Sequence, residues 1–354
     1  MTRSAEPTFL ASAGPESEAM LEEYLSRQCD GTIQTLARLD GDVLVLGAGG
    51  KMGFSLCSMA RRSLDAAGQT GRRVIAVSRF GEAAVAAKFR EAGVTVIACD
   101  LLDDGALAAL PDAPNVLYLA GMKFGSSGNL PTTWALNTFL PGLVAQRFRG
   151  ARIVALSTGN VYAFSDTRSS GAKESDPPAP VGEYAQSCLG RERMFTYFAE
   201  QDGTPTTLIR LNYANDLRYG VILDIARAVF SRQPVDVTMG HVNVIWQGDA
   251  DAAILQSFSL CASPPAVLNV CGPQTVAVRD LALRLAELLG APPPTFTGKE
   301  AATALLSDGS RQQELFGAPR VPLDTLLAWT ARWLQQGGRT LQKPTGFEKR
   351  DGKF

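Results

Sequence analysis

The stretch DVLVLGAGGKMG, residues 42–53, decides the fold of this chain. A short apolar run leads directly into a glycine-rich turn, and the following residues 54–64 have a helical pattern. Glycine permits a tight turn and a close approach of the backbone to phosphate oxygens, while the N-terminus of the helix offers free N–H groups to an anion. Strand, turn and helix in this order predict a dinucleotide site, lined by Gly47, Gly49, Gly50, Lys51, Met52 and Gly53.

The apolar runs that follow extend this unit into a larger sheet. Short runs rich in Val, Ile and Leu lie at residues 72–78, 94–99, 115–121, 152–158 and 206–212. The segments between them are long enough for crossover helices, which is typical of parallel strands. We therefore predict an α/β fold with a doubly wound parallel sheet, the Rossmann arrangement, over residues 42–212.

The two ends of the chain have a different pattern. Helical periodicity at residues 221–230, 249–258, 278–289 and 323–334 predicts a smaller, mainly substrate-binding lobe over residues 213–340, from which a late strand at about 266–270 returns to the sheet. Leu21, Tyr24 and Leu25 recur at helical spacing, so residues 1–41 are expected to form a helical N-terminal extension. The polar, basic residues 341–354 are expected to be a surface tail.

Composition excludes several classes of function. The 354 residues include 34 basic and 35 acidic side chains, and the net charge of −1 attracts neither nucleic acid nor anionic lipid. With His241 as the single histidine and six cysteines without a CxxC pair, we expect no metal site and no Ser/His/Asp triad, unless His241 is its base. No segment approaches about 18 uncharged apolar residues, and the first twenty lack a signal-peptide stretch, so we expect a cytoplasmic protein that acts on small molecules.

The end of the second strand bears on the choice of dinucleotide. An acidic residue there usually holds the ribose 2′-hydroxyl of NAD, whereas an arginine suits the 2′-phosphate of NADP. Ser78 and Arg79 stand at this place, so we prefer NADP over NAD, although an exposed surface arginine gives the same pattern. Asp100 and Leu101 follow the third strand, where a carboxylate accepts from the adenine amino group or closes a strand-end turn.

Further motifs follow in order along the chain. They are LAGMK at 119–123, Asn137, STGNVY at 157–162, EYAQSC at 183–188, Glu192 and LNVCGP at 268–273. Together with the glycine turn, this series resembles the NAD-dependent epimerase/dehydratase family of the extended short-chain dehydrogenase/reductase superfamily, over about residues 42–335. The resemblance implies a homodimeric, nicotinamide-dependent enzyme that exchanges a hydride with a hydroxyl or carbonyl carbon of a sugar, as an epimerase, dehydratase or oxidoreductase.

The resemblance also implies roles for individual residues. Thr158 would hydrogen-bond the substrate, and Tyr184 would act as the acid/base. The cofactor would be lined by residues after the fourth strand and on the two following helices, namely Leu119, Ala120, Gly121, Lys123, Asn137, Tyr184 and Cys188. Asn160, Asn212 and Tyr213 would contact the substrate with Thr158, because open α/β sheets bind ligands at the carboxyl ends of their strands. Turn chemistry is an equal explanation for the asparagine that ends the sixth strand.

Cys188 is the main departure from the family pattern, because the family's YxxxK motif has a lysine at this position. A phenol with a reference pKa of about 10 needs a nearby cation to lose its proton at neutral pH. A thiol supplies no positive charge, and a thiolate would raise the tyrosine pKa further. The usual mechanism therefore does not carry over unchanged.

Three hypotheses account for the missing lysine. In the first, which we prefer, another cation acts on Tyr184, with Lys123 as the first candidate and Arg191 and Lys173 behind it. In the second, Tyr184 only donates a proton, as in the reduction of a carbonyl group. In the third, the protein binds a dinucleotide without turnover and acts as a sensor or scaffold.

Overall fold

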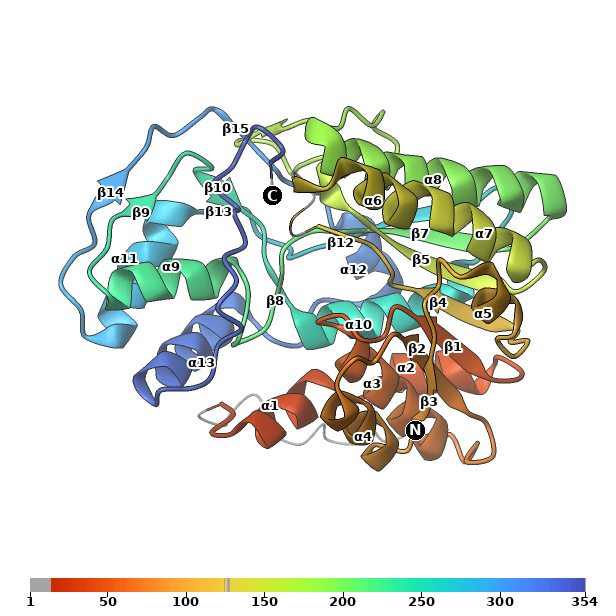
Figure 1. Cartoon of the computed structure of the whole chain (residues 1–354). Helices are drawn as coiled ribbons and strands as arrows, with labels where there is room; N and C mark the ends of the chain where they lie inside the picture. Colours follow the sequence, from red (N-terminus) through yellow and green to blue (C-terminus); the bar gives the residue numbers. More distant parts are fainter. Residues whose placement is uncertain (1–13, 124, 126–127, 354) are drawn as a thin grey trace.

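A seven-stranded parallel sheet forms the centre of the chain, which is described here by a computed structural model covering residues 14–123, 125 and 128–353 (Figure 1). The strand order is β12-β7-β5-β4-β1-β2-β3. The strands are β1 (Val43–Leu46), β2 (Val74–Ser78), β3 (Thr95–Ala98), β4 (Asn115–Tyr118), β5 (Arg152–Thr158), β7 (Thr206–Leu211) and β12 (Ala266–Val270). The six strands predicted over residues 42–212 are confirmed, and the late strand pairs with β7.

The strand order reverses beside β1, which lies between β2 and β4. All four residues of β1 are buried, because helices cover both faces of the sheet. In an open α/β sheet the crevice at such a reversal, outside the carboxyl ends of the strands, is where ligands bind. The glycine turn follows β1 directly and therefore lies at this crevice.

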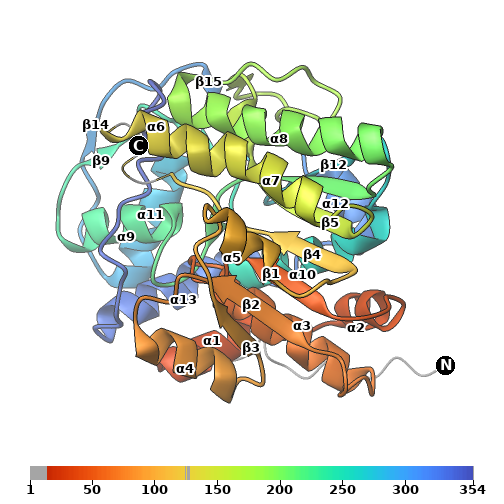
Figure 2. The same cartoon turned by 45° about the vertical axis from the view of Figure 1, so that its right-hand side comes forward.

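Two helical layers enclose the sheet (Figure 2). Val43 and Val45 face a layer made of α2 (Asp30–Ala37), α3 (Gly53–Ala66), α4 (Ala83–Glu91) and α10 (Gln247–Gln256). Leu44 and Leu46 face the opposite layer of α5 (Asp104–Ala108), α7 (Leu140–Arg147) and α8 (Gly182–Asp202). Successive residues of a strand point to opposite faces, so the apolar run of β1 stabilises both layers at once. This is the predicted doubly wound arrangement.

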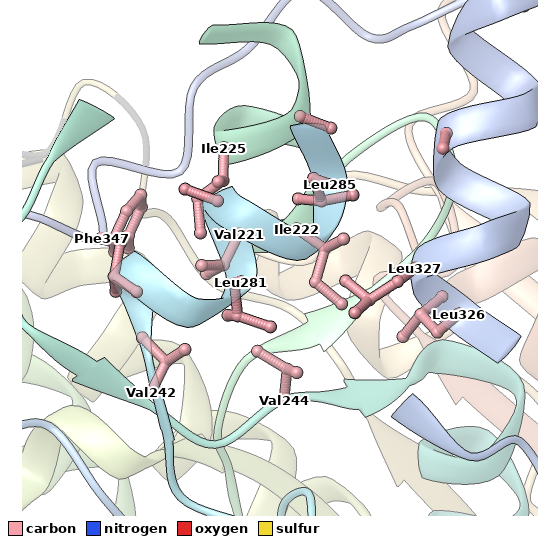
Figure 3. Close-up of a cluster of buried hydrophobic side chains, with 14 of the residues drawn as sticks. Val221, Ile222, Ile225, Val242, Val244, Leu281, Leu285, Leu326, Leu327 and Phe347 are labelled. Carbon is pink, nitrogen blue, oxygen red and sulfur yellow. The ribbon is translucent and has the colours of Figure 1, made fainter. Parts of the chain in front are cut away.

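A smaller lobe stands beside the carboxyl ends of the strands. It contains α9 (Val221–Phe230), α11 (Val278–Leu289) and α13 (Leu323–Gln335), with the two-stranded pairs β9 (Val235–Asp236) with β14 (Phe296–Thr297), and β10 (His241–Val242) with β13 (Val276–Ala277). Its helices pack their apolar faces together around residues such as Leu281 and Leu327 (Figure 3). The pairs β8 (Ala214–Asn215) with β11 (Ile245–Trp246) and β6 (Ser165–Asp166) with β15 (Thr303–Ala304) join this lobe to the sheet domain, and α12 (Ser310–Phe316) packs beside β12.

The predicted N-terminal extension connects the two parts of the molecule. Its helix α1 (Glu18–Leu25) packs into the core of the small lobe, where the ring of Tyr24 lies 5.4 Å from that of Trp329, centre to centre. Its second helix, α2, packs instead against the sheet domain through Leu36. Residues 1–13 of the extension lie outside the described residues.

The end of the chain is not the surface tail that its composition predicts. Thr345, Gly346 and Phe347 are buried, and Phe347 belongs to the core of the small lobe (Figure 3). Polarity misled the prediction, because the polar groups of this segment bond to protein groups instead of solvent. We refer to residues 343–352 as the strap. Among the described residues no helix is long and apolar enough to cross a membrane.

Candidate functional site

The glycine turn after β1 has the shape that a dinucleotide pyrophosphate requires. Gly47 has a φ of +85°, and a Cβ there would lie 2.6 Å from the backbone nitrogen of Ala120. A Cβ on Gly53 would lie 1.9 Å from the carbonyl oxygen of Ala48. Helix α3 begins without a side-chain cap, so no protein side chain takes the place of an anion at its N-terminus. Gly49, Gly50 and Lys51 are exposed on this turn, and these residues fit a bound dinucleotide.

The region expected to hold the adenosine is open to solvent. Arg79 is exposed at the end of β2, and Ser78 lies next to the glycine turn, since a Cβ on Gly49 would come within 2.5 Å of its Oγ. Asp100 is exposed, and its Oδ1 accepts a hydrogen bond of 3.1 Å from the Leu102 amide. This is the strand-end turn, and it leaves the second carboxylate oxygen for a ligand. Leu101 is buried in the core of the sheet.

The segment after β4 forms the floor of the crevice. The Leu119 amide donates to the Leu46 carbonyl, which continues the sheet, and Ala120 lies beneath Gly47. Gly121 is exposed on the crevice side. This segment is placed by Asn137, whose Oδ1 accepts from the Met122 amide at 2.8 Å and whose Nδ2 donates to the Met122 carbonyl at 2.9 Å.

Asn137 requires a correction to its predicted role. It lies in η3 (Ala135–Phe139), which continues α6 (Leu130–Trp134), and it is fully buried. Its Nδ2 also donates to Ser187 Oγ at 3.0 Å, and its Oδ1 accepts from Arg191 at 2.9 Å. With both polar atoms bonded to protein, Asn137 does not line the cofactor groove. It fixes the lining segment to helix α8 from below.

Thr158 and Tyr184 come together at the carboxyl end of β5. Thr158 is the last residue of β5, and its Oγ1 accepts from the Asn160 side chain at 3.0 Å. Tyr184 lies in the first turn of α8 and hydrogen-bonds with both Thr158 and Cys188. Burial raises the pKa of Tyr184 well above its usual value, and the neighbouring Cys188 adds to this shift. The phenol is therefore neutral at physiological pH in this structure.

Cys188 is a buried thiol rather than a groove-lining ligand group. It is 1% exposed and packs with Val161, Tyr162 and Ala172, with Tyr184 at the edge of this cluster. Burial raises its pKa, although the charge of Arg191 acts in the opposite direction. A protonated, enclosed thiol neither supplies a positive field nor acts as a nucleophile. The predicted direct contact of its side chain with the cofactor is not compatible with this burial.

Arg191 is the buried cation beside this tyrosine. It follows Tyr184 and Cys188 at helical spacings of seven and three residues, so the three share one face of α8. Its Nη1 donates to the Leu156 carbonyl at 2.6 Å, and its Nη2 lies directly under Gly121, where a Cβ would come within 2.2 Å. Its charge is the one that lowers the pKa of Tyr184 against the effect of burial. Sequence reasoning placed Arg191 behind Lys123, although the shared helix face was a usable signal.

Two lysines give the mouth of the crevice a positive charge. Lys123 donates from its Nζ to the Thr345 carbonyl at 3.4 Å, and burial lowers its pKa to about 8. The ammonium of Lys51 lies 2.9 Å from the ring centre of Tyr219. Partial desolvation in the crevice, followed by the charges of Lys123 and Lys343, lowers the pKa of Lys51 to about 7. Both lysines line a cavity of about 190 Å³ that Thr158 also lines.

The expected substrate contacts lie around the same cavity. Asn160, Asn212 and Tyr213 all line it, and Asn160 and Tyr213 extend into a second, smaller space beneath the strap. Asn212 is buried and donates from Nδ2 to Asn243 Oδ1 at 2.9 Å, so its amide nitrogen is already engaged. Tyr213 has a φ of +43°, a left-handed conformation that turns the chain at the end of β7 toward the cleft.

Comparison with protein families identifies the central part of the chain. Residues 43–214 match the NAD dependent epimerase/dehydratase family, from β1 to the residues after β7. These residues belong to that family. The match covers the glycine turn, the Thr158–Tyr184 pair and the Cys188 position, so the predicted membership is confirmed for this region. No curated protein sequence matches the chain.

Solved structures of this family share the fold with the whole chain except about a sixth. MoeE5 in complex with UDP-glucose and NAD superposes with a TM-score of 0.66 and 24% identity, covering 84% of this chain and 99% of its own. UDP-glucose 4-epimerase from Thermotoga maritima gives 0.68 and 17%, covering 84% and 99%. UDP-glucuronic acid 4-epimerase from Bacillus cereus, in complex with NAD, gives 0.67 and 16%, covering 83% and 99%. At these identities the likeness shows the fold. These NAD complexes give no support to a preference for NADP.

Proposed function

We propose that this protein is a nicotinamide-dependent enzyme that acts at a hydroxyl or carbonyl carbon of the sugar of a sugar nucleotide. The observation that carries the proposal is the Thr158–Tyr184 pair, which meets at the carboxyl end of β5 beside a glycine turn shaped for a dinucleotide. Solved structures of this fold in complex with UDP-sugars and NAD support the substrate class. The reaction is epimerisation, dehydration, oxidation or reduction.

Each residue of the pair has a distinct task in this proposal. When bound, the nicotinamide would supply a hydride donor or acceptor. Thr158 orients the reacting oxygen of the sugar by a hydrogen bond, and Tyr184 Oη gives a proton to that oxygen or takes one from it. Gly121 and Ala120 leave room for the cofactor above Arg191, while Lys51 and Lys123 attract an anionic ligand to the mouth of the crevice.

The raised pKa of Tyr184 bears on the direction of proton transfer. A neutral phenol is ready to donate, so the resting site is prepared for the reduction of a carbonyl group. Proton removal from a hydroxyl needs the phenolate, and an opposite charge close by lowers a pKa by about 1–3 units. Arg191 is in place to do this from below, and Lys123 from the cleft side. We propose that Arg191 carries most of this effect, with Lys123 in second place.

For the cofactor we propose a nicotinamide dinucleotide held by the glycine turn, Ser78 and Asp100. Exposed Arg79 stands where a 2′-phosphate would lie, and no acidic side chain occupies the end of β2. This keeps NADP as the sequence-based preference, whereas the relatives of known structure bind NAD. Direct titration of both dinucleotides decides between them.

The test of the proposed function is turnover by the full-length protein. NAD or NADP is supplied with UDP-glucose or UDP-glucuronic acid, and products are followed by NMR, because an epimerase leaves no net reduced cofactor. We expect a new sugar signal that falls about 100- to 10,000-fold in rate in Tyr184→Phe, with dinucleotide affinity unchanged. A protein that binds dinucleotide but converts none of a wide panel of sugar nucleotides would instead be a sensor or scaffold.

We also propose a homodimer through the outer face of α7 and α8. This face carries an apolar groove lined by Trp134, Phe139, Leu143, Met194 and Phe198, and Phe139 is 59% exposed. An exposed patch of this kind is typical of an interaction surface. Analytical ultracentrifugation should show a dimer for the unaltered protein and a monomer for Phe139→Glu. A monomer in both would contradict this proposal.

A further inference from the structure

The strap crosses the mouth of the crevice from the small lobe to the sheet domain. In Figure 1 the indigo end of the chain rises from α13, passes between the two parts of the molecule and ends near β15. It starts beside α9, where the Leu341 amide donates to the Arg218 carbonyl at 3.0 Å. It ends on the first turn of α8, where a Cβ on Gly352 would lie 2.3 Å from the Val181 carbonyl. The strap therefore spans the opening that leads to Tyr184.

Three separate contacts hold the strap in place. The amide and the hydroxyl of Thr345 both donate to Asp224 Oδ2 on α9, each at 2.7 Å. Phe347 inserts among the apolar side chains of the small lobe (Figure 3). Arg350 donates to the carbonyl and hydroxyl of Thr303 at 2.6 and 2.7 Å. These contacts make the strap an ordered part of the fold in this structure.

The inner side of the strap touches the proposed reaction site. The Thr345 carbonyl accepts from Lys123, and Thr345 lines the 190 Å³ cavity that contains Thr158. Gly346, Phe347 and Lys349 roof the adjoining space next to Asn160, which measures only about 20 Å³. A space of this size holds about one water molecule.

The remaining room is too small for the proposed ligands. Sites for cofactors and similar ligands occupy roughly 300–1,000 Å³ and enclose most of the ligand. The two spaces together fall well short of this, although they must take both the nicotinamide end of the cofactor and a sugar. Since the strap forms the roof of the smaller space, moving it is the direct way to enlarge the site.

The contacts of the strap are also of a kind that can be exchanged. Asp224 and Lys123 each find water or a ligand when the strap leaves, so the apolar contact of Phe347 is the main one lost. Burial of one such side chain contributes roughly 1.5–3 kcal/mol. Glu348 lies near enough to Asp224 to repel it, which weakens the closed arrangement. Opening therefore does not require the sheet domain to unfold.

We propose that the strap, residues 343–352, is a gate that must leave the cleft to admit the sugar nucleotide and that closes over the sugar end of the site. This gate rests on the proposed function for the identity of its ligand. Its geometry gives the end of the chain a specific task, because Thr345 holds the ammonium of Lys123 while the gate is closed and releases it when the gate opens.

A reversible cross-link tests the gate directly. The side chains of Asp224 and Thr345 touch, so the full-length double variant Asp224→Cys/Thr345→Cys can be oxidised to fasten the strap and reduced to free it. Binding of UDP-glucuronic acid and UDP-glucose is measured in the presence of dinucleotide by calorimetry, and turnover is measured where it occurs. We expect at least a tenfold loss of both in the oxidised form and recovery with dithiothreitol. The two single-cysteine variants, oxidised in the same way, control for the six natural cysteines.

Mass spectrometry confirms the cross-link, and equal binding by fastened and freed protein would overturn the gate. Turnover separates the two proposals: unaltered protein that binds UDP-sugars without converting them refutes the proposed function but leaves the effect of the cross-link on binding intact. Hydrogen exchange of the unaltered protein gives a second measurement that needs neither cross-link nor substrate. The amides of Thr345 and Phe347 should exchange far faster than those of β1 and β4. Exchange of the strap only with the core strands would contradict the gate.

Discussion

The cofactor half and the substrate half of the crevice are built on different principles. The cofactor half is local: the residues from Val43 to Gly53 form strand, turn and helix, and their shape follows from backbone sterics. The substrate half collects side chains from β5, α8, the residues after β7 and the end of the chain. A local structure can be recognised in the sequence, whereas an assembled one depends on the fold around it.

The departure from the family pattern falls in the assembled half. Cys188 removes the expected lysine, and Arg191 appears one helical turn further along the same face. Its guanidinium is held by Leu156 and Asn137, which come from two other elements. The lesson of the comparison is that a change in the assembled half can be compensated at another position, while the local half has no such alternative.

The largest effect is expected in the local half. In Gly53→Ala the new methyl group meets the Ala48 carbonyl at 1.9 Å, so the turn must move. We expect dinucleotide affinity to fall about 100-fold or more, since displacements of about 1 Å at a site have effects of this size. Isothermal titration with NAD and NADP measures it. Gly71→Ala is the control, because nothing lies within 4 Å of its Cβ; a similar loss there, or an unchanged affinity in Gly53→Ala, would contradict the steric argument.

The second effect tests the compensation in the assembled half. Arg191→Met should reduce turnover in the sugar-oxidising direction about 10- to 100-fold and shift the rising limb of its pH profile to higher pH, because the pKa of Tyr184 rises when the cation is lost. Cys188→Ala should change the rate little. Arg191→Lys should restore part of both the rate and the profile.

The pH profile separates electrostatics from structural damage. Loss of the hydrogen bonds to Leu156 and Asn137 alone would lower the rate without moving the limb. Lys123→Met is the matched variant on the cleft side. If it moves the profile and Arg191→Met does not, Lys123 replaces the missing lysine, as the sequence alone predicts.

The third effect concerns a buried acid in the local half. Asp251 is fully buried under α3, and neither carboxyl oxygen has a hydrogen-bond partner, because the nearby Ser55 hydroxyl donates to the Met52 carbonyl. Burial raises the pKa of Asp251 well above its usual value. The folded protein thus retains a proton that the unfolded chain loses above about pH 4, so this group lowers stability as pH rises.

Asp251→Asn tests that sign. We expect the free energy of unfolding in urea to increase by about 2 kcal/mol at pH 8 and by less at pH 5. An equal gain at both pH values would mean that the carboxyl group does not titrate as its burial indicates. A loss at pH 8 would show that Asp251 is ionised and paired in the folded protein.

The smallest effect concerns the edge of the local half. Arg79 is exposed, and a surface charge contributes less than a buried one. Arg79→Ala should weaken NADP binding by about 1 kcal/mol, or several-fold, and leave NAD binding unchanged. Equal affinities of the unaltered protein for the two dinucleotides would contradict the preference for NADP.

The sequence predicts the sheet and the glycine turn because each depends on neighbouring residues. Runs such as 43–46 are apolar since both faces of the strand are buried, and this signal needs no knowledge of the partner elements. The strap could not be predicted, because the contact of Phe347 with the small lobe and of Thr345 with Asp224 joins residues more than a hundred positions apart. Asn137 shows the same limit: its position was recognised, but its burial and four bonds depend on three elements.

The core of the small lobe combines both ends of the chain. Leu21 and Tyr24 enter it from α1, and Phe347 enters it from the strap. During synthesis the sheet domain has all its strands once residue 270 has been made, whereas this lobe waits for the last residues. Contacts of such long sequence separation form slowly. The lobe that receives the substrate should therefore be the last part of the protein to fold, and the part most exposed to aggregation before the chain is complete.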